Sequence, residues 1–192
     1  MRVFRKAGYL AVSALLALGF WQFGQGTYIP AKAWLAQELM QRAWVRTGVG
    51  EERAKPWPWA DTWPVARLTA KARGIDLIVL AGGSGRTLAF GPGHLSASAL
   101  PGEIGNTIIA GHRDTHFQFL RNIQAGELIG METASGQGHL YKVIGIDIVD
   151  ARKGSLLLDT QAAMLTLVTC YPFDAREAGG PLRYVVTAKM LF

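Results

Sequence analysis

Cysteine is nearly absent from this sequence: Cys170 is the only one in 192 residues. A single cysteine excludes an internal disulfide and leaves one thiol that needs an explanation. The chain also lacks any block of like charges, any low-complexity tract and any internal repeat. No Walker or dinucleotide-binding pattern is present, because the glycines at 82–83 and 91–93 read as turns. These absences exclude a nucleotide-binding protein with one of these motifs and a repeat protein.

The positive charge has no pattern that suits nucleic acid. The formal net charge is +6, but Arg2, Arg5 and Lys6 stand at the extreme N-terminus. The remaining excess is scattered, and no basic stripe interleaves with aromatic residues. The sequence therefore predicts no nucleic-acid partner.

Residues 7–23 form an uncharged apolar run behind those basic residues. Such a run is at the short limit of the ~17–25 residues that span a bilayer. Residues 1–24 are therefore predicted to be a cytoplasmic basic flank and a single-pass transmembrane anchor, with the rest of the chain exported. The alternative is a signal peptide cleaved at the small-x-small site 31–33. Pro30 and Lys32 make that cleavage region poor, which favours the anchor.

Residues 25–54 are predicted to form an amphipathic helix and a spacer. In 31–47, apolar residues fall at helical spacing on one side: Trp34, Leu35, Leu39, Ala43 and Trp44. This helix either packs on the following domain or lies against the membrane surface. The prolines at 56, 58 and 64 then indicate an extended linker. Its tryptophans are expected to clamp it to the domain, or else to line a ligand groove.

Residues 55–192 are predicted to be one all-β domain. Short apolar segments recur between Gly, Pro, Asn and Asp, a pattern typical of a sandwich or barrel. The expected strands are 65–70, 75–81, 87–93, 106–111, 127–133, 140–150, 164–170 and 183–191, with a helical or irregular insertion at 116–123.

Cys170 closes the apolar, β-branched run 165–169, and Pro172 should end that strand. The thiol is therefore expected at the rim of a sheet, either as a nucleophile or as an inert core residue. Arg183 opens the last predicted strand, so a hairpin would make it a neighbour of Cys170. There it could donate to a carbonyl or an oxyanion, or be an ordinary surface arginine.

His112 is the favoured candidate base among the four histidines, because it also follows a predicted strand. Two other uses of its segment stay open. His112 and His116 are four residues apart and could hold a metal if the segment were helical, but no HExxH pattern is present. Asp114 could instead hydrogen-bond an imidazole or cap the turn at 116–120.

Three motifs together resemble the sortase family of membrane-anchored cysteine transpeptidases. Residues 166–170 (TLVTC) resemble the TLxTC signature, 109–112 (IAGH) the segment that carries the sortase histidine, and Arg183 stands where the family has its arginine. The segments FGPGH, PGEIGNTIIAGHRDTHF and TCYPFD resemble the Gram-negative branch, class GN. The resemblance covers the chain from about Lys55 to its end.

The resemblance implies a closed eight-stranded β-barrel that cleaves an LPxTG-like C-terminal sorting motif after its threonine. Cys170 would attack the threonine carbonyl to form a thioacyl-enzyme, and an amine acceptor would resolve it. His112 would be the general acid and base, and Arg183 would steady the oxyanion or hold the substrate backbone. Ala110, Thr169, Asp114 and Tyr171 are further candidates for substrate binding.

No cofactor and no metal are implied, and no acidic cluster argues for the calcium that some relatives use. The resemblance to the Gram-negative branch places the anchor in the inner membrane and the barrel in the periplasm. The loop at 171–182 differs from its Gram-positive counterparts, so the motif and the acceptor stay open. A cysteine hydrolase on the same scaffold and a membrane-tethered binding module with an inert cysteine are the alternatives.

Overall fold

The computed structural model of the chain describes residues 15–16, 18–19, 22, 31–154, 158, 160–175 and 179–191. It divides into two compact units, Met1–Glu38 and Leu39–Phe192. The predicted boundaries at residues 24 and 54 stay predictions.

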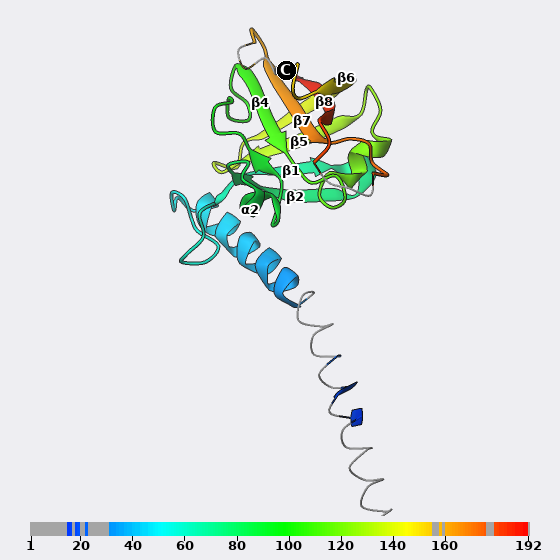
Figure 1. Cartoon of the computed structure of the whole chain (residues 1–192). Helices are drawn as coiled ribbons and strands as arrows, with labels where there is room; N and C mark the ends of the chain where they lie inside the picture. The colour runs from blue at the N-terminus through cyan, green and yellow to red at the C-terminus, as the bar shows by residue number, and fades with distance from the viewer. Residues whose placement is uncertain are drawn as a thin grey trace, which may run out of the picture. The chain divides into compact units, whose positions relative to one another are not determined.

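The second unit contains a closed β-barrel (Figure 1). Its strands follow one another around the barrel in the order β1-β2-β3-β4-β7-β8-β6-β5, and β5 pairs with β1 to close it. They are β1 (Pro64–Ala70), β2 (Ile75–Ala81), β3 (Gly93–His94), β4 (Gly105–Ala110), β5 (Leu128–Thr133), β6 (Gly138–Asp150), β7 (Ala163–Cys170) and β8 (Leu182–Met190). Short helices are η1 (Lys71–Arg73), α2 (Gly85–Leu88) and η2 (Gln118–Asn122). The predicted eight-stranded barrel is thereby confirmed.

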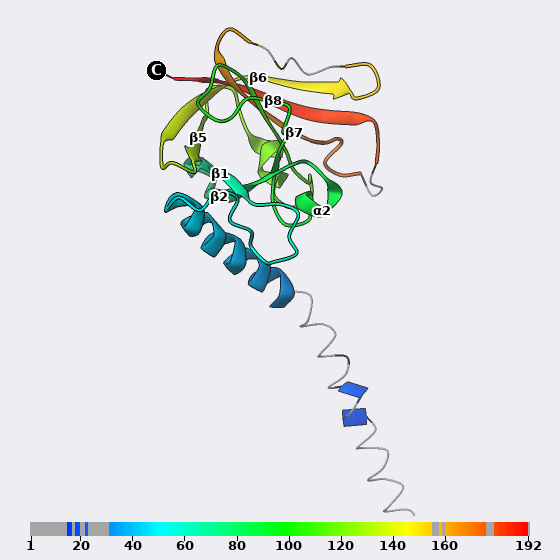
Figure 2. The ribbon, with the colours of Figure 1, turned by 90° about the vertical axis from the view of Figure 1, so that its left-hand side faces the viewer.

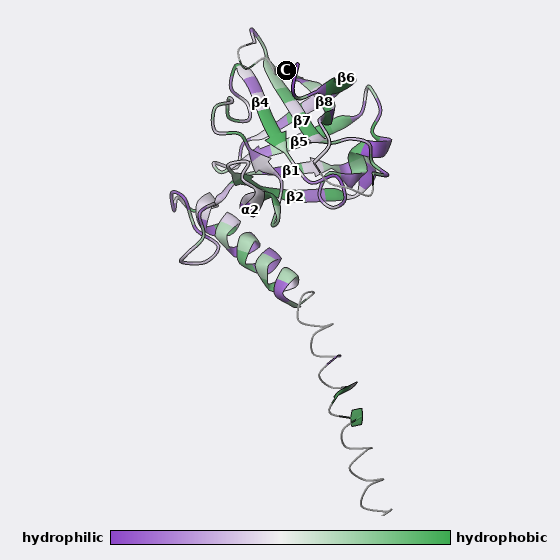
Figure 3. Ribbon diagram, viewed as in Figure 1, coloured by the Kyte–Doolittle hydropathy of each residue, from purple (hydrophilic) through white to green (hydrophobic). Residues whose placement is uncertain are grey.

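Alternating side chains of the strands fill the barrel. Leu68, Ile109, Leu165 and Val186 come from four different strands and are all fully buried in one cluster. Figure 3 colours most of β4 and β7 as hydrophobic, as expected for strands at the centre of a sheet. The long antiparallel pair β6–β8 stands along one side of the barrel (Figure 2). Because β4, β7 and β8 all contribute side chains to this core, they are rigid supports for the residues at their ends.

Seven of the eight predicted strands match the structure closely, and the strand expected at 87–93 is wrong. Ser84 accepts a hydrogen bond from the Thr87 backbone N–H at 3.2 Å and so caps the short helix α2. An N-cap of this kind satisfies one of the open donors of a first helical turn. Only Gly93 and His94 remain extended, as β3. The predicted insertion is present as η2.

Residues 31–48 are helical, and the predicted apolar side is buried only in part. Met40, Ala43 and Trp44 are buried, whereas Trp34 is 70% exposed and Leu35 is 49% exposed. Apolar residues occur around much of this helix, so spacing alone could not choose the buried side. Met40 and Trp44 form a cluster with residues of β2, which supports the packed alternative for this part of the helix.

Most of the predicted transmembrane run 7–23 lies outside the described residues. Among the residues that are described, no helix has the length and apolar content needed to cross a membrane. The anchor therefore stays a prediction.

Two of the three linker tryptophans are held by ring contacts. Trp57 meets Phe90 edge-on at 4.9 Å between ring centroids, and the Arg53 guanidinium lies 5.0 Å from the centre of the Trp63 ring. Trp59 is 83% exposed. The expected clamp is thus confirmed for Trp57, whereas the contact of Trp63 with Arg53 lies within the linker itself.

Trp44→Ala should lower the free energy of unfolding by about 3 kcal/mol, because it removes a large buried ring from the cluster with Ile78 and Leu80. Trp59→Ala is the matched control and should change it by less than about 0.5 kcal/mol, since that ring is exposed. Urea unfolding of the two variants tests this. Equal stability of both would show that the helix adds nothing to the barrel.

Candidate active site

The candidate histidine and cysteine stand at the ends of two neighbouring parallel strands. β4 pairs with β7 in parallel up to Ala110 opposite Val168, and the Gly111 N–H donates to the Val168 carbonyl at 3.1 Å. Two residues further along each chain bring His112 level with Cys170. Neighbouring strands lie about 4.8 Å apart, so the two residues are adjacent at the barrel rim.

Arg183 lies on the other side of Cys170. The antiparallel pair β7–β8 places Cys170 directly opposite Arg183, which confirms the predicted neighbourhood. The Tyr171 N–H donates to the Leu182 carbonyl at 3.0 Å, so the next pair along is hydrogen-bonded. Hydrogen-bonded and non-bonded pairs alternate, and the Cα atoms of a non-bonded pair lie only about 4.5 Å apart. Both side chains therefore leave the same face of the sheet close together.

The Arg183 guanidinium turns back onto its own hairpin. Its Nη1 donates to the carbonyls of Gly180 at 2.6 Å and Leu182 at 2.9 Å. Within the described part of the chain both bonds use Nη1, so Nε and Nη2 can donate to a ligand.

A tight turn holds His112 in place. A Cβ atom on Gly111 would stand 2.7 Å from Cγ of Phe117, so only glycine fits under that ring. Phe117 is fully buried, and its N–H donates to the His112 carbonyl at 3.0 Å. The turn is thus pinned to the barrel core, while the His112 side chain is exposed.

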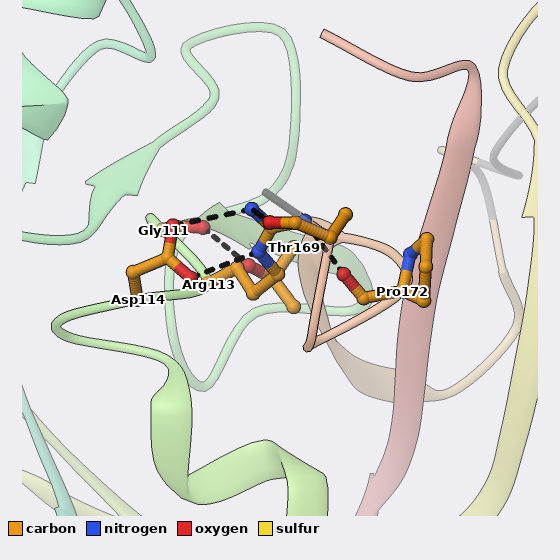
Figure 4. A network of polar contacts seen from close by, with 6 residues as sticks. Gly111, Arg113, Asp114, Thr169 and Pro172 are labelled. Carbon is orange, nitrogen blue, oxygen red and sulfur yellow. Dashed lines mark hydrogen bonds and ion pairs between the residues drawn. The ribbon is translucent and has the colours of Figure 1, made fainter. Parts of the chain in front are cut away.

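Arg113 is a site residue that the sequence reasoning missed. It is 6% exposed, and its guanidinium donates to the carbonyls of Pro172 at 2.6 Å and Ala175 at 2.9 Å. It also pairs with Asp114, as Figure 4 shows. Hydrogen bonding to Asp114 is the main cause of the raised pKa of Arg113, and the negative charges of Cys170 and Asp174 add to it. In the sequence, the only signal that Arg113 belongs to the site was its position directly after His112.

Two of the predicted substrate-binding residues have other contacts. Thr169 is 2% exposed, and its hydroxyl donates to the Gly111 carbonyl at 2.7 Å, so it ties the two strand ends together and has no surface for a substrate (Figure 4). Asp114 forms an ion pair with Arg113 at 3.0 Å. It does not cap the turn, because η2 begins after Phe117 without a side-chain cap.

Ala110 and Tyr171 remain accessible, since both are partly exposed at the strand ends. The Tyr171 ring stacks on Tyr184 with centroids 6.1 Å apart, and Phe173 meets Tyr184 edge-on at 5.0 Å. Burial, followed by the Tyr171 charge, raises the pKa of Tyr184. Tyr171, Phe173 and Tyr184 therefore form an aromatic cluster near the end of β7.

The other histidines are placed less favourably. His94 is buried and bonded to the Ala99 carbonyl at 3.0 Å, and His139 lies against Gly102, near the opposite end of β4 from His112. Burial, and then the His112 charge, lowers the pKa of His116, which keeps its ring neutral near pH 7. The His112–His116 segment is a turn, which removes the helical spacing needed for a metal pair. No cluster of three metal-ligating side chains occurs in the described part of the chain.

The rim therefore carries the partly exposed Cys170 at the end of β7, with His112 after the neighbouring strand β4 and Arg183 opposite on β8. A thiol beside a base is the arrangement of nucleophilic acyl transfer, and an arginine beside it suits a developing oxyanion.

The profile of the sortase domain matches residues 68–191. The chain belongs to the sortase family. Sortase D of Bacillus subtilis (strain 168) is 30% identical over 115 residues, which make up 59% of this chain and 57% of that protein. The match thus spans little more than half of the length of that relative.

Solved sortase structures share the fold. A sortase D5 transpeptidase from Clostridium perfringens aligns with a TM-score of 0.67 at 23% identity, covering 82% of this chain and 99% of that chain. Sortase A from Corynebacterium diphtheriae aligns with a TM-score of 0.62 at 27% identity, covering 70% and 63% of the two chains.

Proposed function

We propose that this protein is a sortase that works as a cysteine transpeptidase, with Cys170, His112 and Arg183 as its catalytic residues. The observation that carries the proposal is the arrangement of the three residues at one rim: Cys170 ends β7, Arg183 lies opposite it on β8, and His112 follows the neighbouring strand β4 by two residues. Membership of the sortase family supports it.

The reaction is an acyl transfer in two steps. The Cys170 sulfur attacks the carbonyl carbon of the scissile peptide bond, and His112 donates a proton to the leaving amine as that bond breaks. The acyl group is then a thioester on Cys170. An incoming amine attacks the thioester, His112 takes its proton, and the thiolate of Cys170 leaves.

Arg183 stabilises the negative charge that develops on the carbonyl oxygen. Its position opposite Cys170 in the strand register supports this role. A guanidinium can donate two parallel hydrogen bonds, which also suits a peptide backbone.

The proposed substrate is a protein with an LPxTG-like C-terminal sorting motif, cut after its threonine, and the acceptor is an amine. The named relatives, sortases of types D and A, support this class of substrate. The proposed setting is the inner membrane of a Gram-negative cell, with the N-terminus in the cytoplasm and the barrel in the periplasm. The basic residues before the uncharged run 7–23 support this orientation.

Product analysis tests the transpeptidase proposal. The chain in detergent is incubated with a panel of LPxTG-like peptides, with and without a small amine, and the products are weighed by mass spectrometry. A product ending in threonine joined to the amine supports the proposal. A free acid in the presence of every amine tried would identify a hydrolase, and no cleavage of any peptide would contradict the proposed substrate class.

Arg183→Ala should lower turnover about 10²-fold, because it removes donors to the developing oxyanion. Arg183→Lys should recover only part of the loss, since an ammonium keeps the charge but not the planar fork. Initial cleavage rates of the two variants test this. A lysine variant with full activity would show that only the charge matters, and an alanine variant with full activity would remove Arg183 from the mechanism.

A further inference from the structure

Arg113 connects the two segments that carry the candidate base and nucleophile, and no step of the proposed reaction uses it. It follows His112 directly, whereas its acceptors Pro172 and Ala175 follow Cys170 by two and five residues. The bonds join positions 59 and 62 residues apart in the chain. The side chain therefore bridges the His112 turn and the loop that leaves β7.

The burial of Arg113 shows that the bridge is part of the packed structure. The residue is 6% exposed, and a buried cation needs partners for its donors. Nη1 is bonded to one carbonyl, Nη2 to a second, and Nε to Asp114. Because Asp114 is the adjacent residue and its side chain is 69% exposed, the two carbonyls are the contacts that reach across the site.

The described residues after Cys170 have other attachments as well, since the Tyr171 and Phe173 rings contact Tyr184. Phe173 packs against the barrel core, and the Ala175 N–H donates to the Pro172 carbonyl at 3.3 Å. The Arg113 guanidinium donates to the carbonyls of Pro172 and Ala175, which precede and follow Phe173 in the chain. A lysine at this position would offer a single nitrogen and would lack the planar fork that bonds each carbonyl through a separate nitrogen.

We propose that Arg113 is a positioning residue that fixes the segment 171–175 against the His112 turn, and so keeps the Cys170 thiol level with the His112 imidazole. The proposal rests on the proposed function for its catalytic consequence. A second consequence is independent of it: the charge of Arg113 lies near Cys170, so replacing this arginine should change how the thiol reacts with an alkylating agent. The contribution of the Cys170 charge to the raised pKa of Arg113 agrees with that proximity.

The test uses the chain in detergent with Arg113→Met, Arg113→Lys and Asp114→Asn, and Arg121→Met as the control on the exposed face of η2. The first measurement is the rate of alkylation of Cys170 by iodoacetamide as a function of pH. The second is kcat and KM for a cleaved peptide, and the third is urea unfolding.

Arg113→Met should lower kcat about 10-fold or more while KM changes less than about threefold, because the groups are misplaced but the binding surface remains. Its alkylation profile should differ from that of the native chain, because the segment after Cys170 is no longer bonded to the His112 turn. Arg113→Lys should restore the pH profile but only part of kcat. Asp114→Asn should have a smaller effect than Arg113→Met, and Arg121→Met should match the native chain.

Lower stability of Arg113→Met with native kcat and a native pH profile would overturn the proposal and leave a purely structural arginine. If that variant fails to fold, Arg113→Lys decides. Full kcat in this variant, which lacks the planar guanidinium fork, would also contradict the bridge. If the native chain cleaves no peptide, the proposed function fails, but the alkylation profile still tests whether Arg113 acts on Cys170.

Discussion

Cys170→Ala is expected to reduce peptide cleavage by about 10⁴-fold or more, because no other residue can form the acyl intermediate once the nucleophile is gone. Cys170 is the only cysteine of the chain, so no second thiol can replace it. The side chain is half-exposed at the end of β7, and its removal opens no cavity in the core. The free energy of unfolding should therefore change by less than about 1 kcal/mol.

Two measurements separate loss of chemistry from loss of fold. Cleavage of the best peptide is followed by mass spectrometry, and urea unfolding is measured on the same preparation. Cys170→Ser is the matched variant, because it keeps a hydroxyl in nearly the same place but is a far weaker nucleophile. Cleavage at the native rate in either variant would remove Cys170 from the mechanism, and unfolding of both would show that the residue is part of the core.

His112→Ala should lower turnover about 10²- to 10⁴-fold, the range that general acid–base groups contribute. Without the imidazole, the leaving amine is not protonated and the incoming amine is not deprotonated. His116→Ala is the natural control, because that ring is on the same turn and the charge of His112 contributes to its lowered pKa. It should change turnover by less than about threefold, since only a group within hydrogen-bond reach of the transferred proton contributes.

The pH dependence of the two histidine variants adds a second criterion. Loss of His112 should remove the limb of the rate profile that reports on the imidazole, whereas loss of His116 should leave that limb in place. If His116→Ala proves the more damaging change, the assignment of the base is wrong.

The β7–β8 hairpin was predictable because its information is local. Residues 164–170 and 183–191 are both rich in apolar and β-branched residues, and the loop 171–182 joins them directly, so an antiparallel pair with Cys170 and Arg183 as neighbours followed. The helix α2 was missed although Ser84 and Thr87 have the spacing of a cap. The apolar residues after Thr87 outweighed that signal.

The contacts of the site that join distant parts of the chain could not be predicted from local sequence. The parallel pairing of β4 with β7 joins segments almost 60 residues apart, and nothing in either segment names the other. His112 was selected from its strand-end position and from the resemblance to sortases. Arg113 was overlooked because a charged residue in a loop is usually solvated, and its two carbonyl partners exist only after the fold has formed.

The most direct test of the central claim is the mass of the intact protein during turnover. The chain is mixed with a cleaved peptide in the absence of amine, quenched in acid within the first turnover, and weighed before and after digestion. The account predicts an added mass equal to the acyl fragment through its threonine, located on Cys170 and removed by an added amine. Cleavage without that adduct, or an adduct that persists in Cys170→Ala, would contradict it.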